Sequence, residues 1–130
     1  MADRVWIRWE APVVASTGIK VMPYDEHTVE RVRRALAGHK FVEKKVMGGL
    51  CFMVRGAMCC SVSSRGLLIR VGPELHAQMI REPHAGPMKM GRRTMSGFVR
   101  VDPKGYRTDA ALAVWIERGL ACVARLSSRR

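Results

Sequence analysis

The sequence predicts an α+β fold, a two-layer sandwich in which helices lie on one face of an antiparallel sheet. Three observations predict it. A capped helical segment precedes a run of short apolar segments separated by turn residues, a second helix interrupts the strands, and a long helix ends the chain. Helices and antiparallel strands in this order are typical of such sandwiches. A chain of 130 residues fits one domain with a sizeable core.

The first helix is predicted to begin after Asp25 and to end near Gly38. Asp25 is a suitable N-cap because its carboxylate can accept from free backbone N–H groups, and glycine is common just past a helix C-terminus. Val29, Val32 and Leu36 recur at helical spacing and form one apolar stripe.

Four strands are predicted next, because short apolar segments alternate with turn residues. The turn signals are Gly48-Gly49, Arg55-Gly56 and the four residues 63–66. Separators of this length are typical of antiparallel hairpins. The expected strands are Phe41–Met47, Leu50–Val54, Ala57–Val62 and Leu67–Val71.

The second helix is predicted to begin at Pro73, because proline is favoured at the first helical position. Residues 83–96 hold two prolines and two glycines, so we expect a long connection with at most a short strand at Met88–Met90. A further strand is expected at 97–101. The element order is therefore α-β(3–4)-α-β(1–2)-α.

The last helix is predicted to follow a tight turn and to end before the tail 127–130. Pro103 suits the second position of that turn, and the Asp102 side chain is expected to accept a local backbone hydrogen bond. Thr108 is the expected N-cap. The apolar face of this helix comprises Ala111, Leu112, Trp115, Ile116, Leu120 and Val123.

Residues 1–21 fit neither helical nor strand periodicity cleanly, and two interpretations stay open. In the favoured interpretation, translation begins at Met22 and the segment is an extension. In the other, the apolar residues of the segment add a strand. We divide the chain into an N-terminal extension (1–21), one domain (22–126) and a basic tail (127–130). Neither a membrane span nor a secretory signal is apparent, so we expect a cytoplasmic protein.

The strands carry apolar residues at both parities, so the sheet is predicted to have two apolar faces. Leu50, Phe52 and Val54 alternate with Cys51 and Met53. Met58, Cys60 and Val62 likewise alternate with Ala57 and Cys59. A second apolar face needs a cover, which could be a twin subunit in a homodimer or the N-terminal extension.

The four cysteines do not indicate a metal or redox site. Successive side chains on a strand point to opposite faces, so Cys59 and Cys60 are not expected to face one metal ion. The sequence has no C-x-x-C, and its histidines lack ligand spacing. We expect buried free thiols, no disulfide, no metal and no cofactor.

No catalytic motif is apparent, and the glycine pair is explained by structure. Gly48 and Gly49 lie between two strands, whereas a phosphate-binding loop joins a strand to a helix. We therefore expect a structural turn there that needs a positive φ. The serines lack a nucleophile elbow, and no pair of carboxylates is poised for acid–base chemistry. The sequence predicts a protein that is not an enzyme.

The net charge of +12 indicates an anionic partner, because 23 basic residues face 11 acidic ones. The best candidate surface is the stretch 89–107, which holds Lys89, Arg92, Arg93, Arg100, Lys104 and Arg107 against Asp102. Candidate anion or partner contacts are Lys44, Lys45, Arg92 and Arg93. No nucleic-acid-binding motif is present, so we expect any DNA or RNA binding to be weak.

Several motifs together resemble the TfoX N-terminal domain family, which is associated with regulators of bacterial natural competence, also called Sxy. They are KKVMGGLCFMVRGAMCCSVS, LLIRVGPE, PM-x-M-x-GRRTMSGFVRVDPKG and the capped last helix, and the resemblance spans about Met22 to Leu126. Where the family typically has K-K-M-F-G-G-L-x-F-M, Val46-Met47 stands at the M-F pair.

The resemblance implies a fold like that of secretion chaperones, α-β(3)-α-β(2)-α, with no established catalytic residues. It also implies a regulatory or protein-interaction role. The alternative, a weak nucleic-acid-binding module, rests on the net charge of +12 and the basic stretch 89–107. Regulators of this group often carry a second, helical C-terminal domain, and we expect this chain to be a single-domain member.

Overall fold

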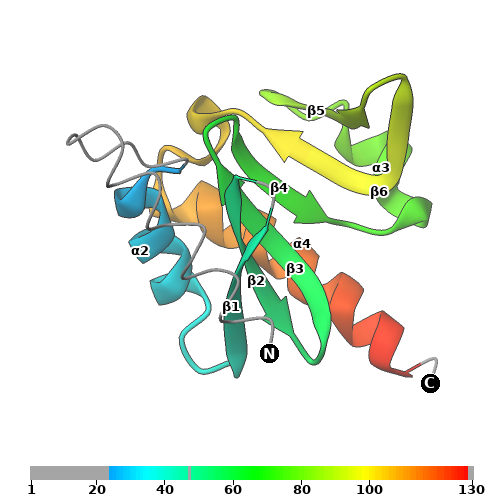
Figure 1. Ribbon diagram of the computed structural model, residues 1–130. Coiled ribbons are helices and arrows are strands. Elements are labelled where there is room, and N and C mark those ends of the chain that lie inside the picture. The colour runs from blue at the N-terminus through cyan, green and yellow to red at the C-terminus, as the bar shows by residue number, and fades with distance from the viewer. Residues whose placement is uncertain (1–23, 47, 129–130) are drawn as a thin grey trace.

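The computed structural model describes residues 24–46 and 48–128, and its helices and strands confirm the predicted α+β fold (Figure 1). The two interpretations of residues 1–21 and the expected strand end at Met47 lie outside the described residues. The elements are α2 (Glu26–Ala35), β1 (Phe41–Val46), β2 (Gly49–Val54), β3 (Ala57–Ser63), β4 (Gly66–Arg70), α3 (Pro73–Met79), β5 (Ala85–Met90), β6 (Arg93–Val101), a 3₁₀ turn η1 (Pro103–Tyr106) and α4 (Asp109–Ser128).

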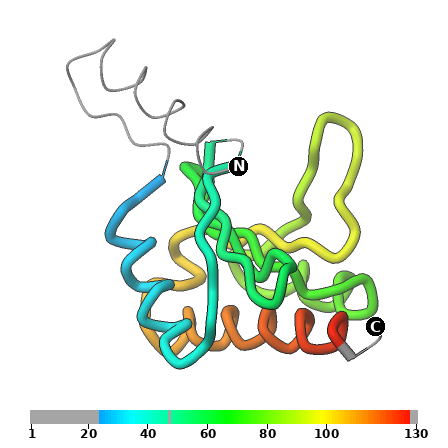
Figure 2. Tube along the Cα trace, turned by 60° about the horizontal axis from the view of Figure 1, so that its bottom comes forward, coloured from blue at the N-terminus to red at the C-terminus, as the bar shows by residue number. Residues whose placement is uncertain are grey.

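The strands form one six-stranded antiparallel sheet in the order β1-β2-β3-β4-β6-β5. β1 and β5 are therefore its two edges. In the tube view, α2 and α4 lie together on one side of the sheet (Figure 2). α4 contacts β3 and β4, α2 contacts α4, and α3 packs against β6. The helices thus lie on one face, as the sequence predicted.

The core lies between the sheet and the helices. One row of side chains crosses four strands in register, from Phe52 through Cys60 and Ile69 to Val99, and all four are fully buried. Buried residues from α2 and α4 complete the core, among them Val32, Leu112, Ile116 and Val123, together with Leu36 at the C-cap of α2. Burial of this apolar area is the main force that holds the two layers together.

Side-chain caps fix where the helices begin, as the sequence predicted. The Asp25 carboxylate accepts hydrogen bonds from the backbone N–H groups of His27 at 3.3 Å and Thr28 at 3.2 Å. Thr108 Oγ1 accepts from the backbone N–H of Ala111 at 3.1 Å. These bonds satisfy donors that the first turn of a helix leaves free.

The expectation of a long connection at 83–96 is wrong, because most of these residues form a β-hairpin. β5 and β6 pair along their length, and Met90 faces Arg93 across a two-residue turn. Gly91 has a φ of 64°, which a two-residue hairpin turn requires and glycine adopts without strain. Pro87 is tolerated because β5 is an edge strand, where one side makes no ladder hydrogen bonds.

The expected alternation of Cys59 and Cys60 is also corrected. The register slips between Phe52 and Met53: Phe52 pairs with Cys60 but Met53 pairs with Met58, so Cys59 is an extra residue in β3. Such a β-bulge interrupts the alternation of faces. Met58 and Cys60 accordingly lie on opposite faces, and the thiols of Cys59 and Cys60 are hydrogen-bonded to each other.

Two smaller expectations near the last helix are wrong. The Asp102 side chain makes no cap hydrogen bond at η1; its backbone carbonyl accepts from the N–H of Gly105 at 2.7 Å instead. α4 does not end before residue 127 but continues to Ser128. No described helix is long and apolar enough to cross a membrane.

Candidate functional site

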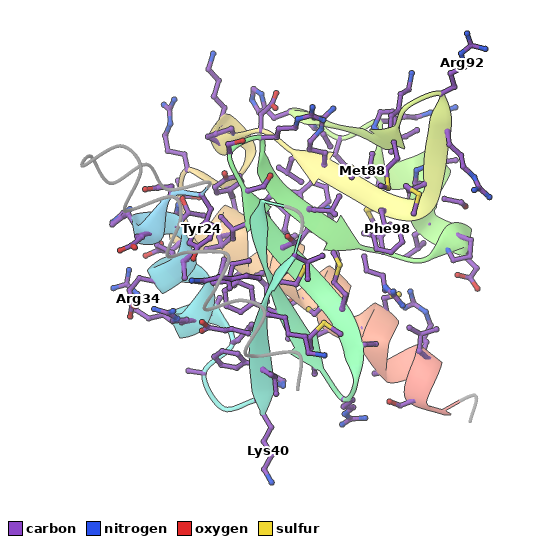
Figure 3. All side chains as sticks on the ribbon, viewed as in Figure 1. Tyr24, Arg34, Lys40, Met88, Arg92 and Phe98 are labelled. Atoms are coloured by element: carbon purple, nitrogen blue, oxygen red, sulfur yellow. The ribbon has the colours of Figure 1, made fainter. Side chains whose placement is uncertain are left out.

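The four predicted contact residues do not form one site. Lys44 and Lys45 lie on β1, at one edge of the sheet, whereas Arg93 begins β6 and Arg92 lies in the turn before it, beside the opposite edge. Arg92 projects outward from the end of the β5–β6 hairpin (Figure 3). Partial burial lowers the pKa of the Lys45 ammonium. Any partner that touches both pairs must span the whole sheet.

The glycine pair serves the β1–β2 turn. Gly48 has a φ of 78°, in the region that glycine adopts freely. Gly49 begins β2, where a Cβ would lie 2.8 Å from the backbone oxygen of Val62. The two glycines therefore have different structural roles, one in a left-handed turn and one in a close approach to β3.

Lys89 and Arg100 of the basic stretch 89–107 line a common hollow of about 460 Å³. It lies on the β5–β6 hairpin, where Gly86 pairs with Arg100, and Asp102 and His84 also line it. Asp102 places a negative charge beside the two cations. The other basic residues of the stretch lie elsewhere on the hairpin or next to η1.

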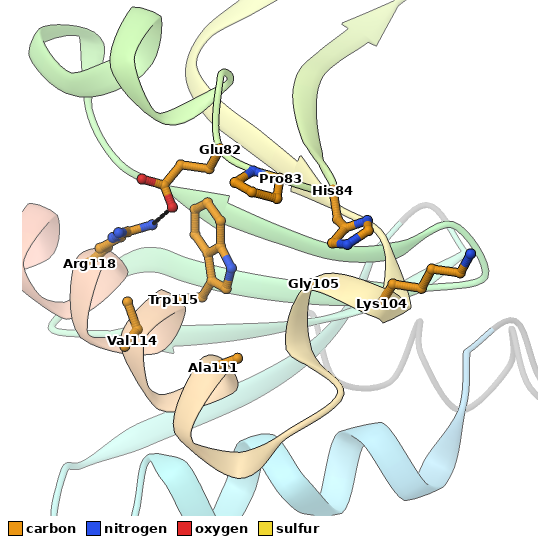
Figure 4. A pocket seen from close by; sticks show the side chains of 9 residues that line it. All are labelled: Glu82, Pro83, His84, Lys104, Gly105, Ala111, Val114, Trp115 and Arg118. Carbon is orange, nitrogen blue, oxygen red and sulfur yellow. Dashed lines mark hydrogen bonds and ion pairs between the residues drawn. The ribbon is translucent and has the colours of Figure 1, made fainter.

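A second hollow, of about 270 Å³, lies between α4, η1 and the segment that leads into β5 (Figure 4). We call it the Trp115 hollow. Its lining residues are Glu82, Pro83, His84, Lys104, Gly105, Ala111, Val114, Trp115 and Arg118. His84 lines both hollows, so they adjoin each other at this residue.

One wall of the Trp115 hollow is held by an ion pair and an aromatic contact. The guanidinium of Arg118 lies 4.5 Å from the centroid of the Trp115 ring, and its Nη1 lies 3.2 Å from Glu82 Oε1. A cation over an indole face is attracted by the ring quadrupole. The pair thus fixes α4 against the segment after α3 and leaves Arg118 neutralised.

The opposite wall is built around His84, which adopts a left-handed φ of 66°. The backbone N–H of Asp102 donates to the His84 carbonyl at 2.8 Å and so anchors this residue to the end of β6. Gly105 packs closely below it, since a Cβ there would lie 3.1 Å from His84 Cβ and 2.6 Å from Val101 Cγ1. Left-handed conformations of non-glycine residues are uncommon and store strain.

The cysteines are buried, and the four thiols are free. Burial and the hydrogen bond from Cys60 act in opposite directions on Cys59, and the hydrogen bond lowers the pKa of that thiol. The same bond, with complete burial, raises the pKa of Cys60 well above its ordinary value. Burial also raises the pKa of Cys51. Because all four thiols are enclosed in the core, they are poorly accessible to reagents.

No group of three or more His, Cys, Asp or Glu side chains that could hold a metal ion occurs within residues 24–46 and 48–128. Two hollows in this part of the chain bring cations and apolar side chains together. Their cations can attract an acidic group.

Lys104 belongs to the predicted basic stretch 89–107, but the other residues of the Trp115 hollow were not predicted as a site. Trp115 was assigned to the apolar face of the last helix, and it is indeed only 4% exposed. Glu82 and Arg118 lie 36 residues apart, so their ion pair depends on how α4 packs. The strand–turn–helix order around 97–109, which places η1 directly before α4, is the part of this arrangement that was predictable.

These observations define a small basic α+β domain with its helices on one face of an antiparallel sheet. The chain belongs to the TfoX N-terminal domain family, since the family model for the TfoX N-terminal domain matches residues 34–123. Comparison with curated proteins gave no match, and comparison with solved structures gave none either.

Proposed function

We propose that this protein is a non-enzymatic regulatory domain of the TfoX type that acts by binding protein, with a second copy of the chain as its first partner. The observation that carries the proposal is the exposure of two valines on β1. Val42 is 57% exposed and Val46 is 37% exposed. An edge strand with exposed apolar side chains offers both backbone groups and apolar surface to another chain.

The register shows which face these valines occupy. Glu43 pairs with the buried Phe52 and binds Arg33 of α2 through two hydrogen bonds of 2.6 and 2.8 Å, so Glu43 faces the helices. Val42 and Val46 therefore face away from them. Val42 is next to Met53, which in turn pairs with Met58, and both methionines are half-buried.

This row of apolar side chains fits a symmetric partner. Two β1 strands related by a twofold axis would pair antiparallel, and each copy would bring its own valines to the contact. Methionine side chains adapt to irregular surfaces, which suits them to the margin of such an interface. The four free, buried thiols support a reducing compartment, and we place the protein in the cytoplasm.

The test is the mass in solution, measured by light scattering on the full chain and two charge variants. We expect twice the 14.6 kDa of one chain for the wild type. Val42→Glu should give a monomer, because a buried unpaired charge at an apolar contact is costly. Val114→Glu is the matched control, since Val114 is 46% exposed on α4 and should leave the dimer intact. A wild-type monomer at high micromolar concentration would contradict the proposed self-association.

Weak nucleic-acid binding is the second candidate function, and the β5–β6 hairpin favours it. Lys89, Arg92 and Arg93 lie close together in sequence at this hairpin, and no described residue forms an ion pair with any of them. Charge of this kind binds phosphates without reading bases.

A further inference from the structure

We propose that the Trp115 hollow binds an acidic peptide segment of a partner protein, with one carboxylate at the rim and an adjoining apolar side chain in the hollow. The inference rests on the proposed function only in taking the partner to be a protein. It concerns a different surface, because the hollow lies at α4 and η1 whereas the proposed self-association uses β1.

The polar groups of the hollow are mainly hydrogen-bond donors. The indole nitrogen of Trp115 lies on the side of the ring that faces Gly105, and His84 and Lys104 lie beyond it (Figure 4). No described residue accepts a hydrogen bond from this indole N–H. An indole can only donate and an ammonium can only donate, so a ligand that supplies acceptor oxygens is complementary to both.

The charges of the hollow favour an anion as well. Glu82 is its acidic side chain, and its carboxylate is engaged by Arg118 at 3.2 Å. The ammonium of Lys104 has no ion pair with the rest of the described chain and is exposed. A carboxylate beside Lys104 would form a charge-assisted hydrogen bond, which is stronger than a neutral one.

The apolar part of the lining sets the second requirement on the ligand. Pro83, Ala111 and Val114 contribute carbon surface, and Val114 is unusually exposed for a valine on a core helix. The volume of about 270 Å³ lies just below the range of roughly 300–1,000 Å³ that is typical for small-molecule sites. One or two side chains of a peptide match this size better than a cofactor does.

The hollow is also held in shape before any ligand arrives. The ion pair and ring contact of Arg118 fix one wall, and the left-handed His84 above Gly105 fixes the other. A pre-organised site loses less conformational entropy on binding, so even a small contact area can bind. Strain held at His84 is consistent with a binding role for that wall.

The test uses ¹H–¹⁵N spectra of the full labelled chain, titrated with a blocked hexapeptide that alternates aspartate and leucine. We expect the indole N–H signal of Trp115 to shift and saturate, and a twin peptide with asparagine for aspartate to leave it unmoved. The signal is assigned with Trp115→Phe. Lys104→Glu should weaken binding at least about tenfold, the loss expected for one charge-assisted hydrogen bond.

Arg92→Glu is the matched control, because it changes the net charge equally at the far end of the hairpin. It should weaken binding by less than about twofold, since exposed charges beyond a Debye length are screened. Lys104→Gln serves as a second variant if Lys104→Glu disturbs the remaining spectrum.

Equal weakening by Lys104→Glu and Arg92→Glu would overturn the proposal, because it would mean general attraction to a basic protein. An unmoved Trp115 signal would overturn it too. Light scattering on the same samples reports the β1 contact independently, so failure of the hollow and failure of the proposed function are distinguishable.

Discussion

Substituting Gly119 tests how closely α4 packs on the sheet. A Cβ added at this position would lie 2.9 Å from the backbone oxygen of Cys59 and 2.9 Å from its Sγ. Real Cβ atoms almost never approach other heavy atoms this closely. One of the two contacts is with backbone, so α4 or β3 itself must move to accommodate alanine.

Two opposing energies decide the outcome for Gly119→Ala. Alanine is better than glycine inside a helix by about 1 kcal/mol. Overpacking a well-packed core costs about 1–3 kcal/mol, and a backbone contact places this site in the upper half of that range. We therefore expect a net loss of about 1–2 kcal/mol, which corresponds to a fall in Tm of roughly 4–8 °C at this chain length.

The assay is thermal and urea unfolding followed by circular dichroism, with Ala121→Gly as the control. Ala121 is exposed two residues further along the same helix, so its substitution measures helix propensity without the contact. Adding Cys59→Ala to Gly119→Ala removes the sulfur contact but keeps the carbonyl contact, so the double variant should lose less than the sum. If Gly119→Ala is instead stabilising by as much as Ala121→Gly destabilises, the close approach is refuted.

Three further predictions concern the helix cap, the thiols and the charge. Asp25→Ala should cost about 1 kcal/mol at neutral pH in urea unfolding. The hydrogen bond from Thr28 lowers the pKa of the Asp25 carboxyl, so this contribution is complete above the ordinary value of 3.8 and is lost as pH falls through the lower folded pKa; a cost that does not decrease as the pH is lowered below 3.8 would contradict it. A thiol reagent should find almost no reactive cysteine in the native protein and four after denaturation without reductant; fewer than four would indicate a disulfide. Affinity for DNA should fall by roughly two to three decades between 50 and 200 mM salt, as four to six phosphate contacts imply; sub-micromolar binding of one sequence at 150 mM that Arg92→Ala with Arg93→Ala abolishes would put the nucleic-acid function first.

Most of the fold was predictable because its signals are local. The N-caps need only one side chain and the next turn of helix, and both predicted caps are present. The turn between β2 and β3 needs two residues with positive φ, and Arg55 and Gly56 have φ values of 54° and 82°. These features depend on the nearest few residues, so a sequence pattern suffices to find them.

The misassigned parts depend on partners distant in sequence. The β-bulge at Cys59 exists because Phe52 and Met53 of β2 pair with residues two apart on β3, and nothing in the local pattern of β3 records that register. The β5–β6 hairpin was hidden for a different reason. Prolines and glycines normally indicate a loop, but an edge strand tolerates Pro87 and a hairpin turn needs Gly91.

The candidate site shows why net charge alone could not locate it. Several basic side chains are used internally: Arg31 donates to the carbonyl of Tyr106 at 2.7 Å, Arg33 binds Glu43, and Arg118 binds Glu82. These residues raise the formal charge of the chain but hold its elements together. In the proposed peptide site the cation is Lys104, which lines the same hollow as Trp115 because α4 packs against η1. In our proposal, specific binding therefore depends on helix packing, and the remaining positive charge is expected to give weak, salt-sensitive attraction.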